Sequence, residues 1–377
     1  MEWEGLRDIV DPILEALNLK VNRHSIVKTI QQTSEAIVEL ITAEVEGQLL
    51  SMKFDCTSKM NRSVMGYYFS FGLFLGVVEL TERHTADYLK RELLKLGQTF
   101  RIQSWQWYSA TIDNATNGIK AVDLIQEKQI DDVCEQFFCN SDEGTEGEDG
   151  GEDGTEDNLD EIVAMCMKNL EINQIECVRC GAHTLNLVVA DATKIAEAEL
   201  KAVTKIVKAY RKAEYQTSFK YSGVAMPPIP NQIRWNHYFL MLRELIKNRE
   251  FFAGLGVKHP MLDLSGSWKV VDDYHEAFAP LYDATIAAQK NDCVISQFHL
   301  EWLKAYGRVM KLGDNRFRTP ILQSMQKRQK TLMSSMPYKA ALFMDPRLNF
   351  NGSELFLNPE KQKIVVNTYL FKTSAIR

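Results

Sequence analysis

The order of the predicted strands and helices constrains the fold of this chain more than any other feature. Alternating apolar and polar residues and β-rich composition predict strands at residues 49–57, 63–72, 73–80, 107–113 and 175–180. The first three strands follow one another directly, whereas helical stretches separate the third from the fourth and the fourth from the fifth. This order predicts an α/β domain in which helices flank a mixed sheet.

Helical patterns fill most of the remaining sequence. Apolar residues recur at helical spacing within residues 1–48, and the same period returns after Ala182. The predicted helices in that later part cover residues 183–212, 231–250, 272–290, 296–312 and 317–334. Three consecutive strands followed by alternating helices and strands are the layout of an RNase H-like fold, here followed by a large all-helical insertion.

These patterns divide the chain into four predicted parts. Residues 1–48 form a helical N-terminal segment, and residues 49–190 form the RNase H-like core. Residues 191–340 form the helical insertion domain, and residues 341–377 form a truncated C-terminal segment.

An acidic tract at residues 140–158 interrupts the predicted core. Its sequence, NSDEGTEGEDGGEDGTEDN, cannot bury apolar surface, so we expect a disordered loop. From Gln129 to Met167 the chain carries fourteen acids and no Lys or Arg, and without these acids the formal charge of −6 becomes +8. A mildly basic body of this kind is compatible with binding a polyanion.

Several classes of protein do not fit the sequence. No apolar run is long enough to cross a membrane, and the first residues carry acids instead of the apolar core of a secretory signal. Seven cysteines in 377 residues do not indicate a disulfide framework, which favours the reducing interior of a cell. The chain also lacks a phosphate-binding glycine loop, a G-x-S-x-G elbow and an H-E-x-x-H helix, and we expect no small-molecule substrate.

Two aspartates stand where an RNase H-like sheet would bring them together. Asp55 lies within the first strand and Asp113 ends the fourth. Facing carboxylates repel one another unless a cation neutralises them, and Mg²⁺ prefers such oxygen ligands. Paired metal ions can activate water and stabilise a leaving oxygen in phosphodiester cleavage. The alternatives are that Asp113 and Asn114 start the next helix as caps, and that Asp55 is an ordinary surface residue.

Cys177, Cys180 and His183 form a C-x2-C-x2-H pattern, which is half of a zinc knuckle. A structural zinc ion needs four ligands, no second pair has knuckle spacing, and Cys166 is the nearest spare cysteine. The ligand count therefore favours buried or hydrogen-bonding residues at a junction between strand and helix.

Two basic segments allow contact with DNA. Arg234 and Trp235 open a predicted helix and could bind a phosphate and stack on an unpaired base, or Trp235 could anchor that helix to the core. The predicted helix from Arg316 to Lys330 carries five cations, which fit either a DNA-facing stripe or a solvated face.

Five segments, taken together and in order, resemble the hAT superfamily of cut-and-paste DNA transposases and their domesticated relatives. The segments, spread over residues 49–350, are KFDCTSKMNRSVMGYYFSF, ATIDNATNGIKAV, RCGAHTLNLVVADA, IRWNHYFLMLREL and FMDPRLNF. The resemblance implies metal-dependent DNA cleavage and strand transfer, a nuclear location, and DNA as the partner; self-association is compatible with it.

The resemblance also assigns roles to residues. Asp55 and Asp113 match the first two acids of the family's D-D-E triad, which bind Mg²⁺ or Mn²⁺. Cys180 and His183 match a signature near the active site. Trp235, after Arg234, matches a residue of the helical insertion that handles a flipped base at the transposon end.

The chain also departs from the family pattern. The glutamate of the triad and the C-terminal dimerisation signature are not found, and the surroundings of Glu301 and Glu354 do not match. The N-terminal zinc-finger domain is also absent. We therefore expect an inactive derivative of a DDE-type transposase that binds DNA weakly. The alternatives are a domesticated scaffold that binds DNA, chromatin or proteins, and an active nuclease in which another carboxylate replaces the missing glutamate.

Overall fold

The structure is a computed structural model, and it describes residues 23–59, 62–69, 74–103, 106–139, 175–230, 235–290, 293–350, 355–356 and 364. The acidic tract at residues 140–158, the helical pattern before residue 23, Arg234 and Glu354 lie outside the described residues.

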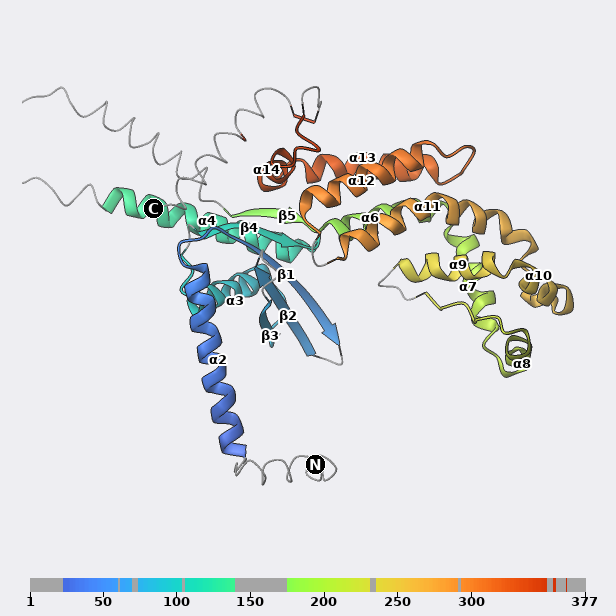
Figure 1. The fold of residues 1–377 in the computed structure, drawn as a ribbon, viewed down its shortest axis with the longest axis horizontal. Coiled ribbons are helices and arrows are strands. Elements are labelled where there is room, and N and C mark those ends of the chain that lie inside the picture. Colours follow the sequence, from blue (N-terminus) through green and yellow to red (C-terminus); the bar gives the residue numbers. More distant parts are fainter. Residues whose placement is uncertain are drawn as a thin grey trace, which may run out of the picture.

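One five-stranded sheet forms in the order β3-β2-β1-β4-β5. The strands are β1 (Leu50–Lys59), β2 (Arg62–Phe69), β3 (Phe74–Leu80), β4 (Trp107–Ile112) and β5 (Glu176–Arg179). β1 to β3 run antiparallel, whereas β4 is parallel to β1 and β5 is parallel to β4. This mixed sheet, flanked by helices, confirms the predicted α/β class and has the arrangement of an RNase H-like fold (Figure 1).

Strand alternation gives the sheet an apolar face. Met52 and Phe54 of β1 are buried, as are Ala110 and Ile112 opposite them on β4. Their core also includes residues of α3 (Ala86–Thr99) and α4 (Thr116–Cys139). Thr85 caps α3 by accepting a hydrogen bond from the Tyr88 backbone N–H, and the helix begins at the next residue, Ala86.

A long helix precedes the sheet. α2 (Arg23–Val45) confirms a helix in the later part of the segment predicted to be helical, residues 1–48. Only its C-terminal part joins the core of the sheet, through Ile41 and Val45, with Val38 packed alongside. Gln106 Nε2 donates to the Val45 carbonyl at 2.7 Å and fixes the end of α2 to the start of β4.

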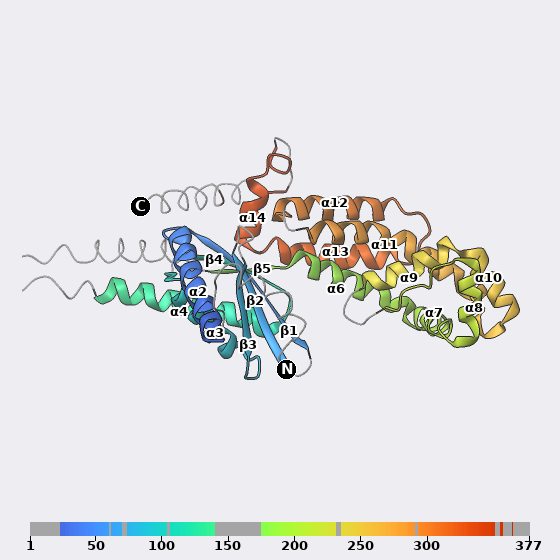
Figure 2. The same cartoon turned by 60° about the horizontal axis from the view of Figure 1, so that its bottom comes forward.

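All elements described after β5 are helical. They are α6 (Gly181–Thr193), α7 (Glu197–Ala209), α8 (Ala213–Ser222), α9 (Asn236–Lys247), α10 (Arg249–Lys258), α11 (Trp268–Ala288), α12 (Ile295–Met310), α13 (Arg318–Leu332) and α14 (Met336–Phe343). Short 3-10 turns occur at Lys194–Ala196, Pro260–Leu262 and Ser265–Ser267. These helices bury a second apolar core, and they extend away from the sheet along α6, with α8 and α10 at the far end (Figures 1 and 2).

Two predicted helices are shorter than expected. The helix predicted over 183–212 is interrupted by the 3-10 turn that begins at Lys194, and the one predicted over 231–250 ends at Lys247. Residues 224–230, which include Pro227, Pro228 and Pro230, follow α8 and are not helical.

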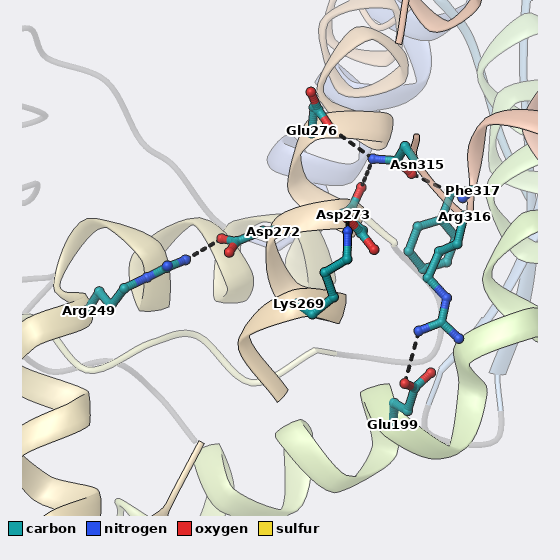
Figure 3. A network of polar contacts seen from close by, with 9 residues as sticks. All are labelled: Glu199, Arg249, Lys269, Asp272, Asp273, Glu276, Asn315, Arg316 and Phe317. Carbon is teal, nitrogen blue, oxygen red and sulfur yellow. Dashed lines mark hydrogen bonds and ion pairs between the residues drawn. The ribbon is translucent and has the colours of Figure 1, made fainter. Parts of the chain in front are cut away.

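A buried amide ties the loop before α13 to α11 (Figure 3). Asn315 Nδ2 donates to the Asp273 carbonyl and to Glu276 Oε2, both at 2.9 Å, and its Oδ1 accepts from the Phe317 backbone N–H. Beside it, Lys269 pairs with Asp273 at 2.9 Å. The predicted helix from Arg316 therefore begins two residues later, because Asn315 holds the preceding turn.

The helical region also contacts the sheet. The Met336 N–H at the start of α14 donates to Glu176 Oε2 of β5 at 2.9 Å, and Val178 of β5 belongs to the helical core. Among the helices that the structure describes, none has both the length and the hydropathy required for a membrane span.

Candidate carboxylate site at the end of the sheet

The strand pairing brings Asp55 and Asp113 to the same end of the sheet. Lys53 of β1 pairs with Thr111 of the parallel strand β4, and Asp113 directly follows the end of β4 at Ile112, so Asp113 lies at the same end of the sheet as Asp55. The prediction that their strands are neighbours is confirmed. By alternation, Asp55 lies on the face opposite Phe54, and its residue surface is exposed.

The surroundings of Asp55 hold its pKa above the ordinary value. Lost hydration is the largest cause, although one side of the residue meets solvent, and repulsion from Asp113 is the second. A hydrogen bond from the Cys56 backbone and the charges of Lys53 and His183 act in the opposite direction. Two carboxylates and two potential cations therefore meet at this end of the sheet.

The thiol beside the carboxylates is held in its protonated form. Burial is the main cause that raises the pKa of Cys56 to about 11, and the charges of Asp55 and Asp113 add to it. In the metal-free protein a thiol with this pKa is protonated at neutral pH and is not a thiolate nucleophile. Asp55 and Asp113 supply carboxylate oxygens beside it.

The start of α6 is fixed to the end of β4. The Cys180 backbone N–H donates to the Ile112 carbonyl at 2.8 Å, and Cys180 is the residue before the first turn of α6. This contact places His183, on that first turn, near enough for its charge to act on Asp55. The structure thus brings Cys180 and His183 alongside Asp55 and Asp113.

The C-x2-C-x2-H pattern lies at this junction between strand and helix. Cys177 and Cys180 are both free thiols, and burial raises the pKa of Cys177 to about 11. In the part of the chain that the structure describes, no group of three or more His, Cys, Asp or Glu side chains is arranged to hold a metal ion. The role of the pattern therefore stays a prediction.

Asp113 also has a local structural role. Its Oδ1 accepts a hydrogen bond from the Ala115 backbone N–H at 2.9 Å, in the turn that leads into α4. Because α4 begins at Thr116, Ala115 and not Asn114 is the residue before the helix. Asp113 therefore stabilises the turn before α4, and neither Asp113 nor Asn114 occupies the capping position that the alternative predicts.

Trp235 lies in the helical region and not beside the aspartates. Its ring packs against Phe239, Phe278 and Tyr282 at centroid distances of 6.3 to 6.4 Å. Its indole Nε1 is buried and has no hydrogen-bond partner among the described residues. These contacts fit the anchoring alternative for Trp235, and its DNA contact stays a prediction.

Two of the five cations of the basic segment before and within α13 form ion pairs with acids of the helical region. Arg316 pairs with Glu199 of α7 at 2.9 Å, and Arg328 pairs with Asp191 of α6 at 2.8 Å. Two of the five cations thus join α13 to α6 and α7. Glu301, considered as a third acid, accepts from Lys304 and Gln297 at 2.8 Å on its own helix, α12.

Sequence reasoning missed two residues that shape the site. Lys53 acts on Asp55 because strand alternation puts both on one face, and this signal is present in the sequence. Phe298 of α12 packs on Gly181 at the start of α6. This second contact joins distant parts of the chain, so no local pattern could have indicated it.

Comparison with known families finds a match in the helical region. Residues 178–277 match the family model described as the ZBED1 RNase-like helical domain. The matched range contains Cys180, His183 and Trp235. A search of curated proteins finds no match to the chain. The family match, together with the RNase H-like sheet, supports a transposase-like protein related to the hAT and ZBED families.

Proposed function

We propose that this chain is a hAT transposase-like protein whose Asp55–Asp113 pair binds one divalent metal ion weakly and which does not cut DNA by itself. The observation that supports the proposal is the pairing of β1 with the parallel strand β4, which leaves Asp55 and Asp113 at the same end of the sheet. Their mutual repulsion, seen in the raised pKa of Asp55, is what a bound cation would relieve.

The donor set fits Mg²⁺ or Mn²⁺. Asp55 and Asp113 would hold the ion through carboxylate oxygens, and magnesium commonly keeps several waters beside one or two protein carboxylates. When bound, such an ion supplies Lewis-acid stabilisation of a phosphodiester oxygen. Lys53 would add positive charge beside a phosphate, and His183 would do so when protonated.

Two carboxylates do not make a complete two-metal site. Each ligand of a paired-ion centre fixes the ions against the attacking and leaving oxygens. Glu301, the described candidate for a third acid, is engaged by Lys304 and Gln297. We therefore propose that the second ion is poorly held, and that phosphoryl transfer by this chain fails for that reason.

DNA remains the proposed partner, in the nucleus. With the acidic stretch from Gln129 to Met167 set aside, the formal charge of the chain is +8. Binding through phosphate contacts should be weak, independent of sequence, and weakened by salt because counterions are released. A non-catalytic scaffold is the second candidate, and the exposed apolar residues of α2 favour it.

The decisive experiment separates metal binding from cleavage. Titration with Mn²⁺, followed by electron paramagnetic resonance, should show one weak site in the wild-type chain and none in Asp55→Asn or Asp113→Asn. Asp123→Asn, an exposed carboxylate on α4, is the matched control and should bind Mn²⁺ as the wild type does.

The same proteins are then tested for nicking and strand transfer in Mg²⁺ or Mn²⁺. We expect no product from any of them. Cleavage by the wild-type chain that disappears in Asp113→Asn would show that a third carboxylate takes part in the reaction. The proposal that this chain does not cut DNA would then be wrong. Equal Mn²⁺ binding by Asp113→Asn and wild type would overturn the metal site.

A further inference from the structure

The outer face of α7 carries a row of lysines. Lys201, Lys205 and Lys208 are exposed, and steps of four and three residues place them on one side of the helix. Lys212 follows in the turn before α8 and is also exposed. The opposite side of α7 is buried in the helical core, through Leu200, Val203 and Val207.

The charge of this segment is of one sign. From Leu200 to Ala213 the sequence contains five Lys or Arg residues and no Asp or Glu. Two of the five are engaged, because Lys201 pairs with Glu197 one turn earlier and Arg211 donates to the Pro227 carbonyl. The remaining three form no ion pair with the residues that the structure describes: Lys205, Lys208 and Lys212.

The three unpaired lysines differ in this respect from the basic segment around α13. Arg316 and Arg328 of that segment pair with acids of α7 and α6, so their charges hold helices together. The unpaired lysines join no two elements of the described protein, and like charges three or four residues apart disfavour a helix. A bound polyanion would relieve this repulsion.

The row has the length of a phosphate contact. At a rise of about 1.5 Å per residue, Lys201 to Lys208 covers about 10 Å of helix. About three phosphates of one strand of B-DNA follow one another over that length, at about 3.4 Å each. Lysine ammonium groups meet phosphates as point charges, and such contacts position a protein on DNA without reading its sequence.

The acidic stretch from Gln129 to Met167 is a second polyanion, carried by the chain itself. It begins within α4, whose C-terminal end points away from α7 and α8 in both views (Figures 1 and 2). α7 instead leads to α8 at the end of the helical region farthest from the sheet. This arrangement favours a polyanion from outside the chain.

We infer that the lysine face of α7, continued by Lys212, is the surface that contacts the phosphate backbone of duplex DNA. The choice of partner rests on the proposed function, which names DNA without placing it on the protein. The inference assigns the contact to Lys205, Lys208 and Lys212, with Lys201 at the edge of the surface. It also separates the contact with DNA from the Asp55–Asp113 pair.

Fluorescence anisotropy with a labelled DNA duplex, from about 50 to 200 mM KCl, tests the inference. Lys205→Gln/Lys208→Gln/Lys212→Gln should raise the dissociation constant by about tenfold or more. It should also reduce the slope of log affinity against log salt by about three, because each phosphate contact contributes about one. The variant should fold, because the three positions are exposed and glutamine and lysine have similar helix propensities.

The matched control removes the same charge from exposed lysines elsewhere. Lys28→Gln/Lys120→Gln/Lys290→Gln should change the salt slope by less than about one. An equal loss of affinity in both triple variants would show that only net charge matters, and the inference would be wrong. Lys205→Arg/Lys208→Arg/Lys212→Arg keeps the charge and should bind DNA as the wild type does.

The outcomes separate this inference from the proposed function. If the wild type binds the duplex and the Lys→Gln variant of α7 binds it equally well, the contact surface is wrong and DNA remains the proposed partner. If the wild type does not bind the duplex at the lowest salt concentration, the proposed partner and this surface are both wrong.

Lysine acetylation in the presence and absence of the duplex, read by mass spectrometry, locates the contact. DNA should protect Lys205, Lys208 and Lys212 and leave Lys28 and Lys120 reactive. A labelled polyglutamate peptide tests the alternative occupant. If the Lys→Gln variant of α7 loses binding to this peptide but not to the duplex, the surface receives an acidic protein segment and the inference is overturned.

Discussion

The ring of Phe298 on α12 fills the space that a β-carbon on Gly181 would need. A β-carbon built on Gly181 would lie 2.7 Å from two atoms of that ring. Gly181 is the first residue of α6 and follows Cys180, whose backbone is bonded to the end of β4. The contact therefore positions the first turn of α6, with His183, against the end of the sheet.

Gly181→Ala should destabilise the protein by about 1–3 kcal/mol, because overpacking forces the ring or the helix to move. Chemical denaturation monitored by circular dichroism measures the loss. Gly254→Ala, in α10 with nothing within 4 Å of the new β-carbon, is the control and should be neutral or stabilising. The double variant Gly181→Ala/Phe298→Leu should recover part of the lost stability. Equal stability of Gly181→Ala and wild type would contradict the close contact.

Replacing Asp113 should change the titration of Asp55. Repulsion from Asp113 helps to raise the pKa of Asp55, so Asp113→Asn should move that pKa down toward its ordinary value in the metal-free protein. Carbon-13 NMR of the aspartate carboxyl groups follows the shift directly. The fall should be partial, because lost hydration is the larger cause. An unchanged pKa of Asp55 would mean that the two carboxylates do not interact.

Asp55 should stabilise the protein when a metal ion is bound and should destabilise it slightly when the ion is removed. Because its folded pKa is above its unfolded pKa, its contribution falls as pH rises through the folded pKa, and the ionised form is unfavourable at neutral pH. In chelator, Asp55→Asn should therefore be slightly more stable than wild type, by less than about 1 kcal/mol at this exposed position. Millimolar Mn²⁺ should raise the melting temperature of wild type only. If Mn²⁺ raises the melting temperature of Asp55→Asn as much as that of the wild type, the ion binds at another site.

The sequence predicts best those helices and strands whose apolar residues recur at a short, regular spacing. Alternation predicts the strands themselves, because each strand carries its own signal, whereas the neighbouring positions of β1 and β4 follow from the RNase H-like order of the elements. The sequence does not show which partners the basic residues around α13 contact. Arg316 and Arg328 meet Glu199 and Asp191, which lie more than a hundred residues earlier, and no local pattern encodes those pairs. Gly181 and Phe298 are also more than a hundred residues apart, so no local pattern predicts their contact.

Asn315→Ala should destabilise the helical region more than the replacement of an exposed polar residue does. The amide donates to the Asp273 carbonyl and to Glu276, and its oxygen accepts from Phe317, all in a buried position. Loss of a buried hydrogen-bonded group costs about 1–3 kcal/mol. Urea denaturation measures the difference. Gln326→Ala removes an exposed hydrogen bond to Tyr306 and should change the stability by less than about 0.5 kcal/mol. Similar losses in both variants would contradict the role of burial.

Acidification should destabilise the protein through His299 before most carboxylates are protonated. His299 on α12 is fully buried, its Nδ1 lies 3.0 Å from the Tyr338 hydroxyl of α14, and its Nε2 has no partner among the described residues. Burial lowers the pKa of His299 to about 4 from an ordinary value of 6.5. Between these values the unfolded chain binds a proton that the folded chain does not, so stability falls as pH drops from 6.5 toward 4.

The full effect of His299 should be about 3 kcal/mol, given that one pKa unit corresponds to 1.36 kcal/mol. Urea denaturation at pH 7, 6, 5 and 4 measures it. His299→Leu should lower the stability at pH 7, because the Tyr338 hydroxyl loses its partner, and should also flatten the dependence on pH below 6.5. His24→Gln, at an exposed position of α2, is the control for a change in histidine number. If His299→Leu and wild type lose stability in parallel as the pH falls, the titration belongs to other groups and His299 is not the source of the acid sensitivity.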